Sequence, residues 1–155
     1  MRGFKKISLK EYTKSQNDET YFHIRIPIRS TSAAAGYDFF MPYDCMIKPK
    51  EKTIIHTGIK AYMNPDEVFL IVIRSSIAFK YNLRLINQIA VIDSDYYDNS
   101  NNEGHIMVTL ENGGNETVYL KTGMRFAQGI FLPYLVSEDE KKPTNQRKGG
   151  MGSTG

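Results

Sequence analysis

The stretch VFLIVIRSSIAFK, at residues 68–80, decides the fold class. Its first six residues are all apolar, and four of them are the β-branched Val and Ile, which favours a buried strand. The segment SSIAFKYN at residues 75–82 then favours a helix of about two turns. A helix this short cannot organise a domain, so the stretch predicts a fold built on strands.

Apolar runs of similar length recur along the chain, and residues that favour turns separate them. The segment ENGGNE, at residues 111–116, predicts a hairpin between the two runs beside it. One more helix is predicted over ISLKEYTK near the start, with Ser8 as its cap. We therefore expect an all-β domain over residues 1–136. The other predicted strands are HIRIPI (23–28), KTIIHTGI (52–59), LINQIAVI (85–92), HIMVTL (105–110), TVYL (117–120) and FAQGIFLPYLV (126–136).

The composition is that of an ordinary globular protein, with 155 residues of which 41% are hydrophobic and 24% are charged. The formal charge of +3 suits small phosphorylated ligands, and it is too small to demand nucleic acid or a membrane surface. A single cysteine, Cys45, excludes an internal disulfide framework and fits a reducing compartment. The N-terminal stretch has no apolar run long enough for a signal peptide or a membrane span, so we expect a cytoplasmic protein.

The chain changes character after Val136. Residues 137–155 contain almost no apolar side chains and end in GGMGSTG, so we expect a flexible C-terminal tail. Its glycines and basic residues have the chemistry of a phosphate clasp, because backbone amides can converge on an anion. On composition alone, a frayed terminus is the simpler interpretation. A second polar stretch, DNSNNEG at residues 98–104, indicates a solvated loop.

Two acidic residues follow the apolar run at residues 85–92. In IDSDY, Asp93 and Asp95 are two positions apart, so an extended chain places both carboxylates on one face. Neighbouring negative charges beside a core are costly unless a cation or a proton offsets them. Asp38 raises the same question, because it stands among aromatic residues in AAAGYDFF and needs a partner or a metal.

The predicted strand at residues 68–73 ends in Arg74, Ser75 and Ser76. Hydroxyl groups at the start of a helix can cap it or bind phosphate oxygens. The residues alone favour capping by one of the serines, with Arg74 in an ion pair. Polar groups in GMRFAQGIF are likewise interpreted as satisfied within a strand, and the three histidines have no metal-ligand spacing.

Taken in order, these stretches resemble the five motifs of the trimeric dUTP diphosphatase (dUTPase) family. The resemblance extends from about residue 27 to the last residue. It implies a jelly-roll-like β-sandwich with one short helix, assembled as a homotrimer in which each active site draws on more than one subunit. In that family, the fifth motif closes over the nucleotide from a neighbouring chain. The five segments are AGYDFF (35–40), RSSIAFK (74–80), NQIAVIDSDYYDN (87–99), GMRFAQGIF (123–131) and GGMGSTG (149–155).

The resemblance implies hydrolysis of dUTP to dUMP and pyrophosphate, which limits uracil in DNA and supplies dUMP for thymidylate synthesis. Asp93 would orient and deprotonate the water that attacks the α-phosphorus. Mg²⁺ bound to the triphosphate would neutralise charge on the leaving group. Asp38 would approach this metal through bound water or pair with an arginine, and Asp95 is interpreted as structural.

The resemblance also implies how the nucleotide is recognised. Tyr96 would lie against the deoxyribose and leave no room for a 2′-hydroxyl. Asn87 and the turn that follows it would read the uracil edge. Met151 replaces the aromatic ring that usually covers the uracil, which predicts a looser lid. Arg147 stands one position later than the arginine of the family. Phosphate contacts are assigned to Ser75, Ser76 and Gln128, the nearby Arg74, and the tail residues Arg147, Ser153 and Thr154.

Two other functions stay open at this point. A dCTP deaminase has a related fold and shares the RSS motif, and Glu111 in HIMVTLEN would be its general acid and base. A non-catalytic nucleotide-binding regulator with the same fold is suggested by Met151 and the displaced Arg147. IDSDY, with its tyrosine, and the GGMGSTG closure favour the diphosphatase.

Overall fold

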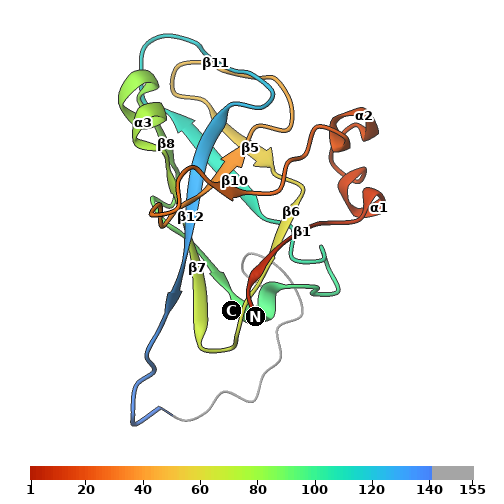
Figure 1. The fold of residues 1–155 in the computed structure, drawn as a ribbon. Helices are drawn as coiled ribbons and strands as arrows, with labels where there is room; N and C mark the ends of the chain where they lie inside the picture. The colour runs from red at the N-terminus through yellow and green to blue at the C-terminus, as the bar shows by residue number, and fades with distance from the viewer. Residues whose placement is uncertain (141–155) are drawn as a thin grey trace.

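The computed structural model describes residues 1–140, and strands make up most of the regular structure in this part of the chain (Figure 1). The expected all-β class is confirmed, while the jelly-roll arrangement stays a prediction. The strands are β1 (Gly3–Lys6), β2 (Ile28–Arg29), β3 (Tyr37–Phe40), β4 (Cys45–Ile47), β5 (Lys52–His56), β6 (Ile59–Tyr62), β7 (Glu67–Ile73), β8 (Leu83–Leu85), β9 (Ala90–Asp93), β10 (Met107–Asn112), β11 (Val118–Leu120) and β12 (Arg125–Pro133). The helices are α1 (Leu9–Tyr12), α2 (Asp18–Tyr21), α3 (Ser75–Tyr81) and the 3-10 helix η1 (Ser94–Tyr96).

The largest sheet has five strands in the order β2-β3-β12-β7-β9, and every neighbouring pair in it is antiparallel. Smaller ladders, β5-β10-β8, β1-β6 and β11-β4, complete the β structure of residues 1–140. Alternation along β7 buries Glu67, Phe69 and Ile71, which share one face of the sheet. The other face of the same strand is only half-buried.

Aromatic rings fill the space over the buried face of this sheet. The ring centroid of Phe4, in β1, lies 5.2 Å from those of Tyr37 and Phe69 and 5.3 Å from that of Phe131. Such offset and edge-on contacts stabilise a core beyond the area they bury. Phe69 lies directly over Gly129, where an added Cβ would come within 2.1 Å of the ring. The glycine of β12 therefore makes room for the ring.

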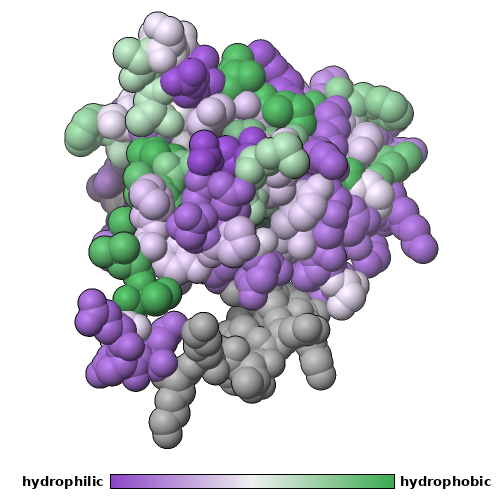
Figure 2. All heavy atoms as spheres, turned by 60° about the horizontal axis from the view of Figure 1, so that its bottom comes forward, coloured by the Kyte–Doolittle hydropathy of each residue, from purple (hydrophilic) through white to green (hydrophobic). Residues whose placement is uncertain are grey.

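The opposite face of the five-stranded sheet is apolar but remains partly exposed within one chain. Register places Val91 opposite Leu70, and Leu132 opposite Val68, so these side chains point to the same side. Val91 is 59% exposed and Leu132 is 40% exposed. Figure 2 shows apolar side chains gathered along the edge of the molecule where the chain leaves β12. We name the half-buried side of the five-stranded sheet the open face, defined by Val68, Leu70, Val72, Val91, Ile130 and Leu132.

Four predicted strands are wrong in extent, and the one predicted at residues 126–136 ends at Pro133. The run at residues 23–28 joins a ladder only at its last residue. The runs at 52–59 and 85–92 each divide into two strands. Gly58 and Gln88 interrupt them with left-handed backbone, at φ of +70° and +61°, through which a strand cannot continue.

The predicted hairpin across ENGGNE is also wrong, because β10 pairs with β5 and β8 while β11 pairs with β4. Asn112 accounts for the difference. Its buried Nδ2 donates to the carbonyls of Ile47 at 2.9 Å and Glu116 at 2.8 Å, and its Oδ1 accepts from the N–H of Gly114 at 2.9 Å. These bonds direct the chain towards β4 rather than back along β10.

Both predicted helices are present. Ser8 caps α1 by accepting a hydrogen bond from the N–H of Glu11 at 3.1 Å, as expected. Helix α2, which Asn17 caps, was not predicted. Within residues 1–140, no helix is both long enough and apolar enough to cross a membrane.

Candidate active site

Asp38 is the centre of a charge cluster, and the residue is only 3% exposed. Its Oδ1 lies 2.9 Å from Nε of Arg74, and its Oδ2 lies 3.2 Å from Nη1 of Arg125. The hydroxyl of Ser30 donates to Oδ2 at 2.6 Å and accepts from Arg125 at 2.8 Å. Of the two alternatives for Asp38, the arginine partner is therefore present, and contact with magnesium stays a prediction.

Strand register explains how three of the quoted motifs meet at this cluster. Gln128 of β12 lies opposite both Asp38 of β3 and Val72 of β7, two residues before Arg74. A Cβ added at Gly36 would lie 2.7 Å from Oε1 of Gln128. The glycine in AGYDFF thus leaves space for the glutamine side chain beside the aspartate.

Ser75 and Ser76 are exposed at the start of α3. The predicted serine cap is wrong, because Arg74 occupies the cap position and its side chain makes no capping hydrogen bond. The guanidinium is instead directed to Asp38. The predicted ion pair of Arg74 is confirmed, and the two serines lie at the surface next to it.

A cavity of about 510 Å³ opens beside Asp38. Three arginines line it, Arg25, Arg29 and Arg125, and the guanidinium of Arg25 lies 3.9 Å from the centroid of the Phe40 ring. One carboxylate against three guanidiniums leaves an excess of positive charge, which suits an anionic ligand. The contribution of residues 25–30 was not predicted, although the spacing Arg-x-x-x-Arg-Ser was a usable signal.

Asp93 lies at the end of β9, where it is exposed and stands opposite Val68 of β7. Asp38 and Asp93 point to the same side of the sheet as the open face, because cross-strand neighbours share a face. Asp38 is in register with Val72 of β7 and Asp93 with Val68, so the two aspartates are offset by four residues along the strands. Three strand spacings separate β3 from β9 across the sheet, and the two offsets together place the aspartates roughly 20 Å apart. One chain therefore does not bring Asp93 to the Asp38 cluster.

Tyr96 and Asn87 stand on either side of β9. Tyr96 is 8% exposed, and its hydroxyl donates to the carbonyl of His105 at 2.8 Å. Asn87 is exposed in the turn between β8 and β9, where the N–H of Ile89 donates to its carbonyl at 2.6 Å. The turn thus holds backbone polar groups and an amide side chain near the surface.

The loop at residues 98–104 is not merely solvated, contrary to expectation. Asn99 and Asn102 are each only 8% exposed, and both donate hydrogen bonds to Tyr96. The sequence did not predict this burial, because a loop with few apolar residues is expected to be exposed. The amides can be buried because hydrogen bonds satisfy them, and the sequence does not reveal the partners.

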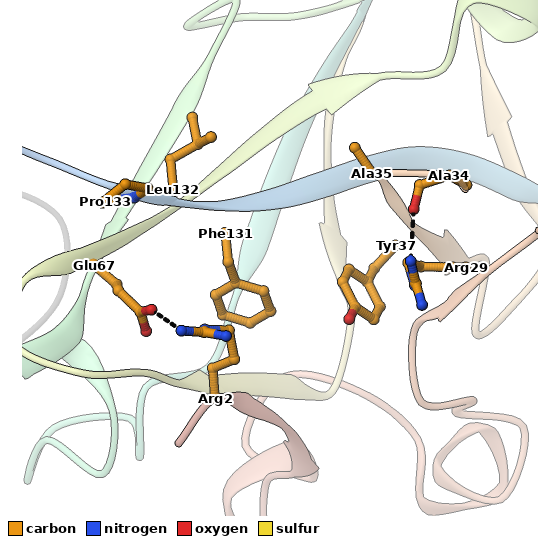
Figure 3. A pocket seen from close by; sticks show the side chains of 9 residues that line it. All are labelled: Arg2, Arg29, Ala34, Ala35, Tyr37, Glu67, Phe131, Leu132 and Pro133. Carbon is orange, nitrogen blue, oxygen red and sulfur yellow. Dashed lines mark hydrogen bonds and ion pairs between the residues drawn. The ribbon is translucent and has the colours of Figure 1, made fainter. Parts of the chain in front are cut away.

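A separate hollow of about 330 Å³ lies next to the aromatic core (Figure 3). In it Arg2 forms an ion pair with Glu67 beside Phe131, and Arg29 donates to the carbonyl of Ala34 at 3.1 Å. The hydrogen bond from Arg2 lowers the pKa of Glu67. None of the predicted site residues lines this hollow, although Arg29 lines both it and the cavity beside Asp38.

Glu111, the candidate acid and base of a deaminase, is engaged in a different way. Its Oε2 accepts a hydrogen bond from Nε of Arg84 at 2.9 Å and also lies 2.9 Å from Nη2 of the same arginine. This hydrogen bond lowers the pKa of Glu111, which keeps the side chain ionised. A carboxylate held in this state is poorly suited to donate a proton.

Four predicted residues of the tail, Arg147, Met151, Ser153 and Thr154, lie outside the described residues. Among residues 1–140, no group of three or more His, Cys, Asp or Glu side chains is placed to hold a metal ion.

Known proteins resemble this chain over most of its length. The family model described as dUTPase matches residues 23–155. The deoxyuridine 5′-triphosphate nucleotidohydrolase of Lactococcus lactis subsp. lactis (strain IL1403) is 45% identical over 133 residues, which cover 85% of this chain and 89% of the relative. The protein of the same name from Clostridium kluyveri is 34% identical over 134 residues, covering 84% and 90%.

Solved structures give the same result. The dUTPase of Streptococcus mutans superposes with a TM-score of 0.74 at 39% identity, covering 88% of this chain and 98% of that chain. The dUTPase of phage phi11 of S. aureus has a TM-score of 0.71 at 19% identity, covering 94% and 97%, and it shares the fold. A mutant of the phage phi11 protein coordinates a structural Mg(II) ion, and a mutant of the phage 80alpha dUTPase has been solved with dUpNHpp.

Proposed function

The chain belongs to the dUTPase family, and from this premise we propose that it hydrolyses dUTP to dUMP and pyrophosphate. The observation that carries the proposal is the family match across residues 23–155, which includes IDSDY with its exposed aspartate at the end of β9. The reaction limits uracil in DNA and supplies dUMP for thymidylate synthesis. The free Cys45 is compatible with a reducing compartment such as the cytoplasm.

Asp93 is the proposed general base. An ionised carboxylate at the exposed end of a strand can hold a water molecule by a hydrogen bond and take its proton. As the proton moves to Asp93, the water oxygen bonds to the α-phosphorus. The bond from that phosphorus to the bridging oxygen breaks, and pyrophosphate leaves with the electron pair.

The triphosphate is proposed to lie beside the Asp38 cluster, against Ser75, Ser76 and Gln128. The excess of arginine around the cavity next to Asp38 supports an anion near this cluster, although Ser75, Ser76 and Gln128 do not line that cavity. Asp38 serves there by holding Arg74 and Arg125 in fixed positions. Mg²⁺ typically binds substrate phosphates with one or two carboxylates, often through water, and when bound it would neutralise charge on the leaving group.

The open face is the proposed contact surface of a homotrimer. Asp93 and the Asp38 cluster lie roughly 20 Å apart in one chain, so a site that uses both must take them from two chains. The open face is apolar and lies between them on the same side of the sheet. Packing copies on this face would bury it and bring Asp93 of one chain towards the Asp38 cluster of another.

Recognition of the nucleoside is assigned to residues on either side of β9. Tyr96 is proposed to lie against the deoxyribose, where a ribose hydroxyl would meet the ring and lack a hydrogen-bond partner. Asn87 and the turn after it are proposed to read the uracil edge, with donors and acceptors that cytosine does not match. The tail residues Arg147, Met151, Ser153 and Thr154 are proposed to close over the nucleotide from a neighbouring chain.

The two alternatives are less well supported. A deaminase would need Glu111 as acid and base, and this side chain is tied to Arg84. A non-catalytic regulator would not need the full set of Asp93, Gln128 and the serines of α3, all of which this chain has.

The test is pyrophosphate release from dUTP and from the four standard deoxynucleoside triphosphates, with magnesium present. We expect release from dUTP alone, and a loss of about a hundredfold or more in Asp93→Asn that folds normally. Asp66→Asn, a change of the same type at an exposed turn, is the control. Ammonia from dCTP would favour the deaminase, and dUTP binding without turnover would favour the regulator.

A further inference from the structure

The hydroxyl of Tyr96 has two partners inside the protein. It donates to the carbonyl of His105 and accepts from Nδ2 of Asn102, both at 2.8 Å. The main chain of Tyr96 is held as well, because its carbonyl accepts from Nδ2 of Asn99 at 2.8 Å. Tyr96 is therefore fixed both at the tip of its side chain and at its backbone.

Asn99 and Asn102 belong to one buried network. Nδ2 of Asn99 also donates to Oδ1 of Asn102 at 2.8 Å, and the same oxygen accepts from the N–H of Gly104 at 3.1 Å. Oδ1 of Asn99 accepts from the N–H groups of Asn101 and Asn102 at 3.0 and 3.2 Å. In the part of the chain that the structure describes, no buried side-chain nitrogen or oxygen lacks a partner. A network satisfied in this way favours a single arrangement of its side chains.

The loop that carries these asparagines packs directly on the backbone of Tyr96. At Gly104, with φ of +81°, an added Cβ would lie 2.7 Å from the carbonyl oxygen of Tyr96 and 3.0 Å from Cα of Tyr97. The positive φ and the close approach both favour glycine. Backbone packing and amide hydrogen bonds thus act on the same tyrosine from one loop.

We propose that Asn102 is a positioning residue for the choice between deoxyribose and ribose. The inference rests on the proposed function, in which Tyr96 lies against the sugar. A ring excludes a 2′-hydroxyl only while it cannot shift away from it. The hydrogen bond from Asn102 to the Tyr96 hydroxyl prevents that shift, so Asn102 sets sugar selectivity without touching the substrate.

The test compares kcat/KM for dUTP with kcat/KM for UTP in the wild type, Asn102→Ala, Tyr96→Phe and the double variant. Each single change removes the hydrogen bond between Asn102 and the Tyr96 hydroxyl, and Tyr96→Phe also removes the bond to the carbonyl of His105. The dUTP-to-UTP ratio should therefore fall by about fivefold in Asn102→Ala and by at least as much in Tyr96→Phe. The double variant should fall no further than Tyr96→Phe, because that variant already lacks the hydrogen bond from Asn102. An unchanged ratio in Asn102→Ala, or a double variant whose fall is the product of the two, would overturn the proposal.

Two matched controls separate positioning from general damage. Asn101→Ala changes the exposed neighbour of Asn102, and Tyr21→Phe removes a tyrosine hydroxyl that donates to the carbonyl of Ile7 at 2.8 Å. Both should keep the wild-type ratio. If Asn102→Ala does not fold, the test is the dUTP-to-UTP ratio of Tyr96→Phe compared with that of Tyr21→Phe. An unchanged ratio in Tyr96→Phe overturns the inference. A wild type that does not turn over dUTP would instead contradict the proposed function.

Discussion

Nε of Arg74 lies 2.9 Å from Oδ1 of Asp38, and this ion pair joins the end of β7 to β3. The aspartate side chain is 5% exposed and the arginine side chain is 25% exposed, so water screens the pair only from the arginine side. Arg125 adds a second cation on the other carboxylate oxygen. Without the carboxylate, two guanidinium groups would face each other with no anion between them.

Asp38→Asn should therefore destabilise the protein by about 2–3 kcal/mol, because removing one partner of a buried ion pair leaves the others uncompensated. Urea unfolding of the purified variant measures the change. Asp44→Asn is the control, since Asp44 forms an exposed pair with Lys121 at 2.7 Å and its loss should matter much less. Equal effects of the two substitutions would contradict the assigned role of Asp38.

Gly129→Ala should cost about 1–3 kcal/mol of unfolding free energy, because a methyl group would overlap a fully buried ring. The added Cβ would lie 2.1 Å from Cζ of Phe69, which is itself packed against Phe4 and Phe131. Gly123→Ala is the comparison, as its Cβ would meet nothing within 4 Å and only its φ of +81° opposes it. A larger loss at Gly123 than at Gly129 would show that the ring can move aside.

The sequence was sufficient to predict the strand-rich class. It also predicted the extents of elements whose hydrophobic pattern is unbroken. The apolar run at residues 68–73 and the helix after it have the expected type and nearly the expected ends. Periodicity did not reveal the breaks at Gly58 and Gln88, because a single left-handed residue does not change the hydrophobic pattern around it. The pairing of β11 was missed because it depends on the amide of Asn112, a long-range partner of Ile47.

The motifs predicted several residues of the candidate site, but they did not predict how those residues are arranged. Asp38, Arg74 and Gln128 come from separate segments, and only strand register shows that they meet. Ser30 was missed because its two site contacts, with Asp38 and Arg125, are with residues of other strands. Asn102 was missed because an asparagine-rich segment looks solvated until its partner, the Tyr96 hydroxyl, is known.

Mixing two inactive variants should restore part of the activity if each site draws on two chains. Asp93→Asn and Gln128→Ala each disable one half of the proposed site. After equal amounts are unfolded and refolded together, about a quarter of the sites should combine an intact Asp93 with an intact Gln128 from another chain. Pyrophosphate release from dUTP measures the recovery, and each variant refolded alone should stay inactive. No recovery, while refolded wild type regains its activity, would place the whole site within one chain.

Stability should fall as the pH drops from about 6.5 towards 4, because burial, with a smaller contribution from the nearby His56, lowers the pKa of His105 to about 4. The Nε2 atom of His105 accepts from the N–H of Gly58 at 3.0 Å, so the ring is neutral with its proton on Nδ1. The unfolded chain takes up a proton at His105 near its ordinary pKa while the folded chain resists, which favours unfolding by roughly 3 kcal/mol once the pH reaches 4. Urea unfolding at pH 7.5, 6, 5 and 4.5 measures the slope. His105→Gln has no group that titrates there, so its slope above pH 5 should be shallower than that of the wild type, and an equal slope would assign the effect to other groups.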